Sequence, residues 1–166
     1  MAKRPGSRSK GLGKSAPSFN PEQVKRAVKT ARSLRYADRA ELLVTMSISF
    51  GLRASELASI KWSDVYDSRG SVRRVITATR AFLPGQILSF DLTGHYRLQR
   101  LLADFYEKYR HPGLPYEQAP LFFSQRGCMK ATSIARHLTA IYRRAGIESG
   151  TSRSGRRTML ANLKLL

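Results

Sequence analysis

The sequence predicts an α+β fold that is mainly helical and carries one small antiparallel β-hairpin. Most segments after residue 20 repeat apolar residues every three or four positions, which is the spacing of one face of a helix. Between Val72 and Leu92 this period gives way to β-formers and then to alternation, on either side of the turn dipeptide Pro84-Gly85. With 166 residues, of which 42% are hydrophobic, the chain can bury one core, so we expect a single folded domain.

The first 18 residues differ from the rest of the chain. They contain no apolar period and no acidic residue, and they carry five cations, namely Lys3, Arg4, Arg8, Lys10 and Lys14. Such a segment cannot offset the entropy lost on ordering, so we expect residues 1–18 to form a disordered basic tail and residues 19–166 to form the folded domain. The tail also lacks the continuous apolar segment of a secretory signal.

The first helix is expected to begin at Asn20, a favourable N-cap. Pro21 suits the first helical position, and Glu22 and Gln23 place oxygen atoms near the free N–H groups of the first turn. The buried face is apolar at helical spacing and consists of Val24, Ala27, Val28 and Ala31. The opposite face is basic and either follows a phosphate backbone or is simply solvated. Its residues are Lys25, Arg26, Lys29 and Arg32.

The second helix is expected to lie at the centre of the core, because it is apolar on nearly every side. Asp38 and Glu41 have the spacing of a capping box at its start, and Gly51 suits its end. A short helix over residues 55–60 should follow and end near Trp62.

After the hairpin, Thr93 is expected to cap a helix that Pro112-Gly113 must end. The segment from Leu121 to Phe123 is either a short strand or an extended anchor.

Two further helices are expected in the C-terminal part. One opens at Thr132 or Ser133 and closes at Gly146, and the last runs from Ser154 to Leu166.

The charge balance indicates a polyanionic partner. Lys and Arg number 30 against 11 Asp and Glu, which gives a net charge of +19 and favours nucleic acid. The longest uncharged stretch, Leu42 to Leu52, has 11 residues and cannot span a bilayer, which needs roughly 20. We therefore expect a cytoplasmic protein. The single cysteine, Cys128, permits no internal disulfide and no cysteine pair for zinc, and we expect no metal or other cofactor.

A basic cluster lies at residues 152–158, with the sequence Ser-Arg-Ser-Gly-Arg-Arg-Thr. It contains three guanidinium groups, those of Arg153, Arg156 and Arg157, together with three hydroxyl groups. If Ser154 caps the last helix, the free N–H groups and the arginines face one anion, which is the usual chemistry of a phosphate site. The alternative is a solvated basic loop.

A second candidate stands at residues 51–57, where Arg53 directly follows the predicted core helix. A charge in that position is costly unless it has a partner or faces an anion. Glu56 lies one helical turn further on and can hold the guanidinium of Arg53 in a fixed orientation. The alternative is a purely structural pair.

Six stretches, in their order along the chain, resemble the tyrosine recombinase family, whose members are also called phage integrases. They are Gly-Leu-Arg-Ala-Ser-Glu-Leu at 51–57, Ile-Lys-Trp-Ser-Asp-Val at 60–65, the predicted hairpin, Pro-Leu-Phe at 120–122, Arg-Arg-Ala-Gly-Ile at 143–147 and Ser-Gly-Arg-Arg-Thr at 154–158. In register the resemblance covers about residues 20 to 163. It implies the catalytic-core fold of that family.

The resemblance also implies a reaction, the cleavage of DNA without metal or nucleotide. In the family a tyrosine attacks phosphorus, two arginines hold the non-bridging oxygens, a hairpin lysine protonates the leaving oxygen and histidines assist proton transfer. Arg53 matches the first arginine and Arg156 the second, while Glu56 matches the acidic residue that supports the first. Forked guanidinium groups suit the developing oxyanions.

The chain departs from the family pattern at several catalytic positions. Arg153 stands where the family has a histidine, and arginine cannot act as a base. No lysine occurs between Lys61 and Lys108. Arg80 is the nearest cation on the hairpin, and it is a poor proton donor because arginine keeps its proton. The last tyrosine, Tyr142, precedes Arg156, so the chain offers no family nucleophile. We therefore expect a partial catalytic domain, truncated at both ends.

The expected function is that of a DNA-binding protein of this family, involved in recombination or integration and catalytically impaired. Its partner is double-stranded DNA, joined by a second copy of the chain or by a partner recombinase, and we expect no membrane association. The DNA contacts expected are Lys25, Arg26, Lys29, Arg80 and Arg157. The alternatives are a non-catalytic DNA-binding remnant or regulator of a mobile element, and a basic RNA-binding protein.

Overall fold

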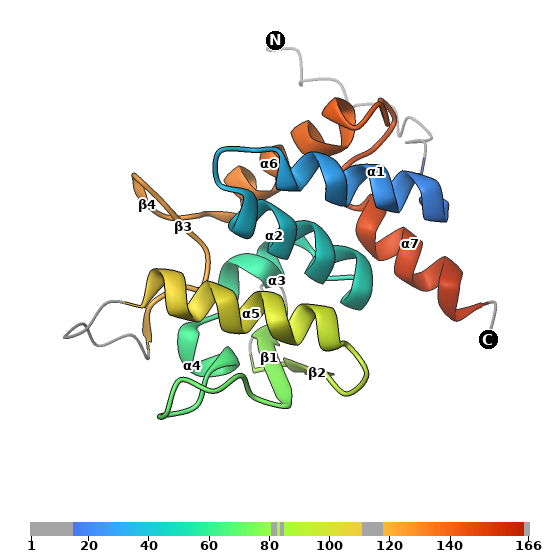
Figure 1. The fold of residues 1–166 in the computed structure, drawn as a ribbon. Helices are drawn as coiled ribbons and strands as arrows, with labels where there is room; N and C mark the ends of the chain where they lie inside the picture. Colours follow the sequence, from blue (N-terminus) through green and yellow to red (C-terminus); the bar gives the residue numbers. More distant parts are fainter. Residues whose placement is uncertain (1–14, 81–82, 84, 111–117, 165–166) are drawn as a thin grey trace, which may run out of the picture.

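The computed structural model describes residues 15–80, 83, 85–110 and 118–164, and within these ranges it contains seven helices and two short antiparallel hairpins (Figure 1). The predicted mainly helical α+β fold with a small hairpin is therefore confirmed. Several sequence-based predictions lie outside the described residues. They concern residues 1–14 of the expected tail, Pro84 of the expected turn, the helix end at Pro112-Gly113 and the last two residues of the final helix, Leu165 and Leu166.

Helix α1 (Pro21–Arg32) begins as its sequence indicates. The side chain of Asn20 accepts a hydrogen bond from the Gln23 N–H at 2.8 Å, and the Gln23 side chain accepts one from the Asn20 N–H at 2.9 Å. Just before the helix, the N–H of Phe19 donates to the hydroxyl of Thr158 at 2.8 Å, which ties the start of the domain to its last helix.

Helix α2 (Ala37–Phe50) forms the centre of the core, as predicted. It packs against α1, α5 (Tyr96–Tyr109), α6 (Ala131–Arg144) and α7 (Ser154–Leu163), and Figure 1 shows it between α1 and α5. The helix ends at Gly51, whose φ of 64° lies in the left-handed region that favours glycine.

The predicted capping box at the start of α2 is wrong. Tyr36 occupies the cap position without a side-chain hydrogen bond. Asp38 instead accepts a hydrogen bond from Lys108 on α5, and Glu41 is buried. The Glu41 carboxylate pairs with Arg32 and Arg97. Cations from other helices therefore bind both carboxylates that the spacing predicts to cap the start of α2.

Two short helices, α3 (Ala54–Ser59) and α4 (Trp62–Val65), follow in place of the single one expected to end near Trp62. Lys61 interrupts them because it forms an isolated bridge with Pro120, and its N–H donates to the Asp64 carboxylate at 2.7 Å. Trp62 therefore begins the second helix. Its ring is buried, with centroids 5.0 Å from Tyr66 and 6.0 Å from Phe105.

The predicted hairpin is confirmed as strands β1 (Val75–Thr79) and β2 (Ile87–Asp91), which pair antiparallel with Ile76 opposite Phe90. Thr93, however, does not cap the next helix. Its N–H and hydroxyl both bind the Asp91 carboxylate, at 2.8 and 2.6 Å, and α5 begins three residues later with His95 at the cap position.

In the C-terminal part, Leu121 and Phe122 are buried and lead into a small hairpin of β3 (Phe123–Ser124) and β4 (Gly127–Cys128). Helix α6 starts at Ala131, one residue before the predicted Thr132, and Gly146 follows its end with a φ of 74°. Among the described residues, no helix is long and apolar enough to cross a membrane.

Ser154 is not the cap of α7 but its first residue. It is fully buried, and its hydroxyl accepts a hydrogen bond from the Thr151 N–H at 3.0 Å. The hydroxyl thus closes the preceding turn and does not meet the free N–H groups of the helix.

Candidate functional site

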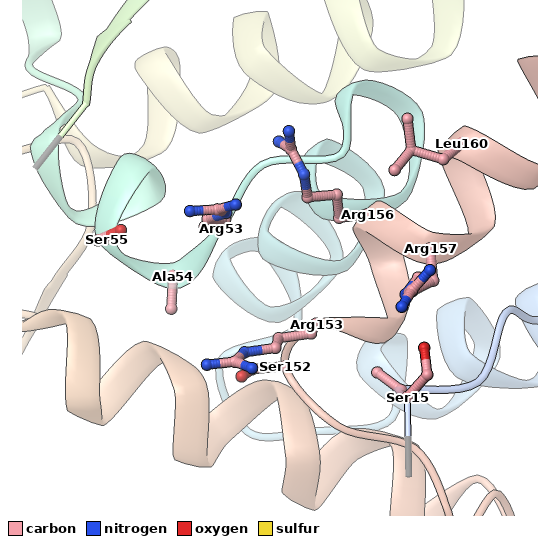
Figure 2. Close-up of a pocket in the computed structure, with 10 residues that line it drawn as sticks. Ser15, Arg53, Ala54, Ser55, Ser152, Arg153, Arg156, Arg157 and Leu160 are labelled. Carbon is pink, nitrogen blue, oxygen red and sulfur yellow. The ribbon is translucent and has the colours of Figure 1, made fainter. Parts of the chain in front are cut away.

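A cleft of about 740 Å³ lies where the start of α3 meets the start of α7 (Figure 2). These two segments are about a hundred residues apart in the sequence, and the basic clusters predicted at 51–57 and 152–158 both contribute to the cleft. The described residues that line it are Ser15, Ala16, Arg53, Ala54, Ser55, Ser152, Arg153, Arg156, Arg157 and Leu160. The structure thus brings four arginines to one hollow.

Arg53 is positioned by the backbone on both sides of it. Gly51 ends α2, Leu52 is buried, and the N–H of Arg53 donates to Glu56 Oε2 at 2.8 Å at the start of α3. Glu56, only 3% exposed, therefore supports Arg53 through the main chain. The expected pair between the Glu56 carboxylate and the Arg53 guanidinium is not found among the described residues, so the guanidinium in the cleft carries an unneutralised charge.

Arg156 reaches the cleft because α7 approaches α2 closely. A Cβ at Gly155 would lie 2.2 Å from Ser47 Oγ, and one at Gly51 would lie 2.4 Å from the Met159 methyl carbon. With glycine at both positions, the half-buried Arg156 lies against the end of α2 and donates from Nη1 to the Gly51 carbonyl at 3.3 Å. This contact leaves the rest of the guanidinium fork free to bind a ligand.

Arg153 and Arg157 flank the other two arginines. Arg153 precedes α7, and its N–H donates to the Thr151 hydroxyl at 3.3 Å. Both side chains are exposed, and Figure 2 shows Arg153 beside Ser152 and Arg157 beside Ser15. Neither guanidinium has an ion-pair partner within the described ranges.

The cleft is strongly positive, and its described lining residues do not exchange protons near neutral pH. Of the ten described lining residues, four are arginines, and the others are serine, alanine and leucine. Arginine stays charged at all accessible pH values and serine does not titrate near neutrality. Four unneutralised charges beside a partly enclosed space focus the field there, so the arrangement can hold an oxyanion but cannot supply a general acid or base.

Other cations predicted to contact DNA lie outside this cleft. Lys25 pairs with Glu22 at 2.9 Å on the exposed face of α1, where Arg26 and Lys29 are also exposed. Arg80, at the end of β1, donates to the Gln86 side chain at 3.2 Å. Of the predicted DNA-contacting residues, Arg157 alone is among the described lining residues of the cleft.

Ser15, Ala16 and Leu160 line the cleft without having been predicted. Leu160 could have been found, since it stands one helical turn after Arg156 on the same face of α7. Ser15 and Ala16 carry no sequence signal, because only the path of the backbone before α1 brings them there.

Tyr142, the last tyrosine in the sequence, belongs to the core. It is fully buried, its ring packs edge-on against Phe19 with centroids 4.8 Å apart, and burial raises the pKa of its hydroxyl. The structure therefore gives Tyr142 a packing role, away from the cleft.

The structure holds no evident metal centre in the part of the chain that it describes, where no three His, Cys, Asp or Glu side chains lie close enough to share an ion. Two histidines are described, and neither lines the cleft. The His95 ring lies 5.0 Å from that of Phe50, and burial lowers the pKa of His137 on α6, helped by the charge of Arg39.

Solved structures with a similar fold include XerA recombinase, with 20% identity and a TM-score of 0.68, and an integrase from mycobacterium phage Brujita, with 19% identity and a TM-score of 0.59. Both alignments cover 95% of this chain, but 53% of XerA recombinase and 46% of the integrase, so the chain spans about half the length of these structures. No protein-family model and no curated protein matches the sequence. The chain therefore has a fold of the tyrosine recombinase and integrase type.

Proposed function

We propose that this chain is a DNA-binding protein of the tyrosine recombinase and integrase type that acts in DNA recombination or integration. The observation that carries the proposal is the convergence of Arg53 and Arg156 on one cleft, together with Arg153 and Arg157. Two sequence segments far apart supply unneutralised guanidinium groups to the same space, within a fold that recombinases share.

The cleft is suited to a backbone phosphate. Forked guanidinium groups donate two parallel hydrogen bonds to a pair of non-bridging oxygens, which a lysine cannot reproduce. Arg53 and Arg156 would hold the phosphate, and Glu56 would keep Arg53 in place through its main chain. The exposed cations Lys25, Arg26, Lys29 and Arg80, with residues 1–18 as a basic tail, would add contacts along the duplex.

We further propose that the site binds a phosphate without cleaving it efficiently. Arg153 stands at the position of the family histidine, the β1–β2 segment contains no lysine, and Tyr142 is buried. A displacement at phosphorus needs an activated nucleophile, a base and an acid. The described lining residues include serine hydroxyls but no tyrosine, and no general base or acid that could activate a hydroxyl or protonate the leaving oxygen. Groups from outside the described lining, such as those of a partner recombinase that carries its own nucleophile, would be needed for cleavage.

The test is equilibrium binding to a short DNA duplex over a range of salt concentrations, by fluorescence anisotropy. We expect affinity to fall steeply with salt, because bound phosphates release counterions. The double variant Arg53→Gln/Arg156→Gln should bind roughly tenfold or more weakly, since each charge-assisted hydrogen bond contributes to affinity. Arg100→Gln/Arg69→Gln, which removes two exposed charges outside the cleft, is the matched control.

Two results would overturn the proposal. One is a double variant in the cleft that binds duplex DNA no more weakly than the control. The other is a clear preference for single-stranded RNA in competition, which would favour the RNA-binding alternative.

A further inference from the structure

The cleft holds more positive charge than an internal DNA phosphate can neutralise. Arg53, Arg153, Arg156 and Arg157 line it, and no acidic side chain in the described ranges forms an ion pair with any of them. The Gly51 carbonyl, which is uncharged, accepts a hydrogen bond from Arg156. An internal phosphodiester carries one negative charge on two non-bridging oxygens. Two forked guanidinium groups are enough to match it, so two of the four arginines remain without a counter-charge.

A terminal phosphate monoester fits this excess better. Its second ionisation lies near 6, so at neutral pH it carries a charge of about −1.5 to −2 and presents three acceptor oxygens. We propose that the cleft recognises a terminal phosphate monoester of DNA, at a nick or a strand end, in preference to an internal phosphodiester. This inference rests on the proposed DNA-binding function and names the group that the same site prefers.

The shape of the cleft allows a terminal group to enter. Its volume of about 740 Å³ exceeds what a phosphate alone requires, and the walls between the arginines are small side chains, Ala16, Ala54 and Ser55 among them. Leu160, 39% exposed, adds an apolar edge against which a sugar can pack. The two arginines not needed for an internal phosphate, Arg153 and Arg157, lie on either side of this space (Figure 2).

Any pH dependence of this preference should come from the ligand. The described lining residues contain no group that titrates between about pH 5 and 8. The carboxylate that contacts a lining residue, on Glu56 of α3, is buried and accepts from the Arg53 N–H, and His95 at the start of α5 packs on Phe50. The preference should therefore increase as a monoester loses its second proton, near pH 6.

The experiment compares nicked DNA duplexes that differ only at the nick. One arm carries a 3′-phosphate, one a 5′-phosphate and one hydroxyl groups on both sides, and each is measured by anisotropy at about pH 7.5 and about pH 5, either side of the monoester ionisation. We expect one phosphorylated arm to bind about tenfold more tightly than the hydroxyl arm at the higher pH, with most of that preference lost at the lower pH. Whichever arm gains identifies the strand end that is recognised.

Variants assign the effect to the cleft. Arg153→Gln and Arg157→Gln should weaken binding to the phosphorylated nick by a larger factor than binding to the hydroxyl nick, and so reduce the preference, because two forked guanidinium groups already match an internal phosphate. Arg100→Gln, at an exposed position on α5, should leave the preference unchanged. All three side chains are exposed, so thermal unfolding followed by circular dichroism should confirm that the fold is retained.

The inference is overturned if all three nicked duplexes bind equally at about pH 7.5, or if the preference survives in both cleft variants. Failure of the proposed function would look different, because then none of the duplexes would bind with a steep salt dependence.

Discussion

Two sets of arginines in this protein differ in what surrounds their guanidinium groups. Arg32 and Arg97 bind the buried carboxylate of Glu41, Arg32 at 2.8 Å, whereas the arginines of the cleft face no acid in the described ranges. The sequence alone does not distinguish the arginines that pair with Glu41 from those that line the cleft. What separates them is whether a carboxylate from another helix reaches the guanidinium.

Glu41→Gln should destabilise the fold by about 1–3 kcal/mol in urea unfolding. The Glu41 side chain is 8% exposed and joins α1, α2 and α5 through two arginines, so a neutral amide would leave two guanidinium groups without their counter-charge. Half of each arginine is in water, which keeps the loss below that of a fully buried pair. Glu22→Gln, in the exposed pair with Lys25, is the control and should cost under about 0.5 kcal/mol. Equal effects of the two substitutions would contradict this role of Glu41.

His137 should make the fold less stable in acid. Burial lowers the pKa of His137 below its ordinary 6.5, so the unfolded chain takes up a proton before the folded one does. The contribution of His137 to stability is therefore fully present above about pH 6.5 and is lost as pH falls from there through the folded-state pKa. Unfolding free energies measured from about pH 7.5 to about pH 5 should show this decline, and His137→Gln should flatten it. A slope unchanged by the substitution would assign the effect to other groups.

At the scale of elements, the packing of α7 on α2 determines whether the cleft exists. Gly155 allows this contact, and Arg156 reaches Gly51 from the next position. In the sequence, Gly155 stands within a basic motif, and nothing indicates that it lies against another helix. Position 155 requires a small residue because Ser47, which is remote in the chain, packs against it.

Gly155→Ala should lower stability and weaken DNA binding together. Alanine raises helix propensity by about 1 kcal/mol, but its Cβ would lie 2.2 Å from Ser47 Oγ and 2.8 Å from the Ser47 carbonyl oxygen, and backbone cannot move aside cheaply. We expect a net loss of about 1–3 kcal/mol in urea unfolding and reduced affinity for duplex DNA. Asn162→Ala, exposed on the same helix, is the control and should change neither quantity appreciably. A stabilised Gly155→Ala protein would contradict the close approach.

Elements with purely local signals were predicted well. Asn20 with Pro21 starts α1, Gly51 ends α2, and the change of period marks the β1–β2 hairpin. The errors occurred where a residue that could cap a helix had a more favourable partner elsewhere. Glu41 binds arginines from two other helices, and Thr93 binds Asp91. Local spacing cannot indicate the competition at Glu41, because its partners are known only once the helices have packed. The contact of Thr93 with Asp91 is local, an Asx-type turn two residues long that the sequence could have shown.

The sequence indicated which residues line the candidate site better than it indicated how they contact one another. The motif resemblance indicated Arg53, Arg153 and Arg156, and all three line the cleft. The role of Glu56 was predicted as a contact with a guanidinium, whereas its carboxylate binds the main-chain N–H of Arg53. Side-chain spacing of one helical turn permits either contact, and the cap position of Arg53 decides between them.

Across the whole molecule, most of the described acidic side chains bind groups of the protein itself. Ion pairs with described cations involve Glu22, Asp38, Glu41, Asp91 and Glu107, while Glu56 and Asp64 bind main-chain N–H groups. With 11 acids against 30 Lys and Arg, this use leaves a large uncompensated positive charge, which a polyanion can neutralise. The cleft is where four such charges meet.

The 166-residue polypeptide alone should form no covalent complex with DNA. Every tyrosine in it precedes Arg156, and the last of them, Tyr142, is fully buried with a hydroxyl whose pKa burial raises. A deeply buried phenol can neither reach a phosphate in the cleft nor ionise readily, and the described lining residues offer no base to assist it. Purified protein incubated with nicked suicide substrates should therefore give no adduct on denaturing gels, while still binding the same DNA in native gels. Adding a partner recombinase that carries its own nucleophile tests donation in trans, and any adduct should then map to the partner. A robust adduct mapped to a tyrosine of this chain would show that the core opens on DNA binding and would overturn the impaired assignment.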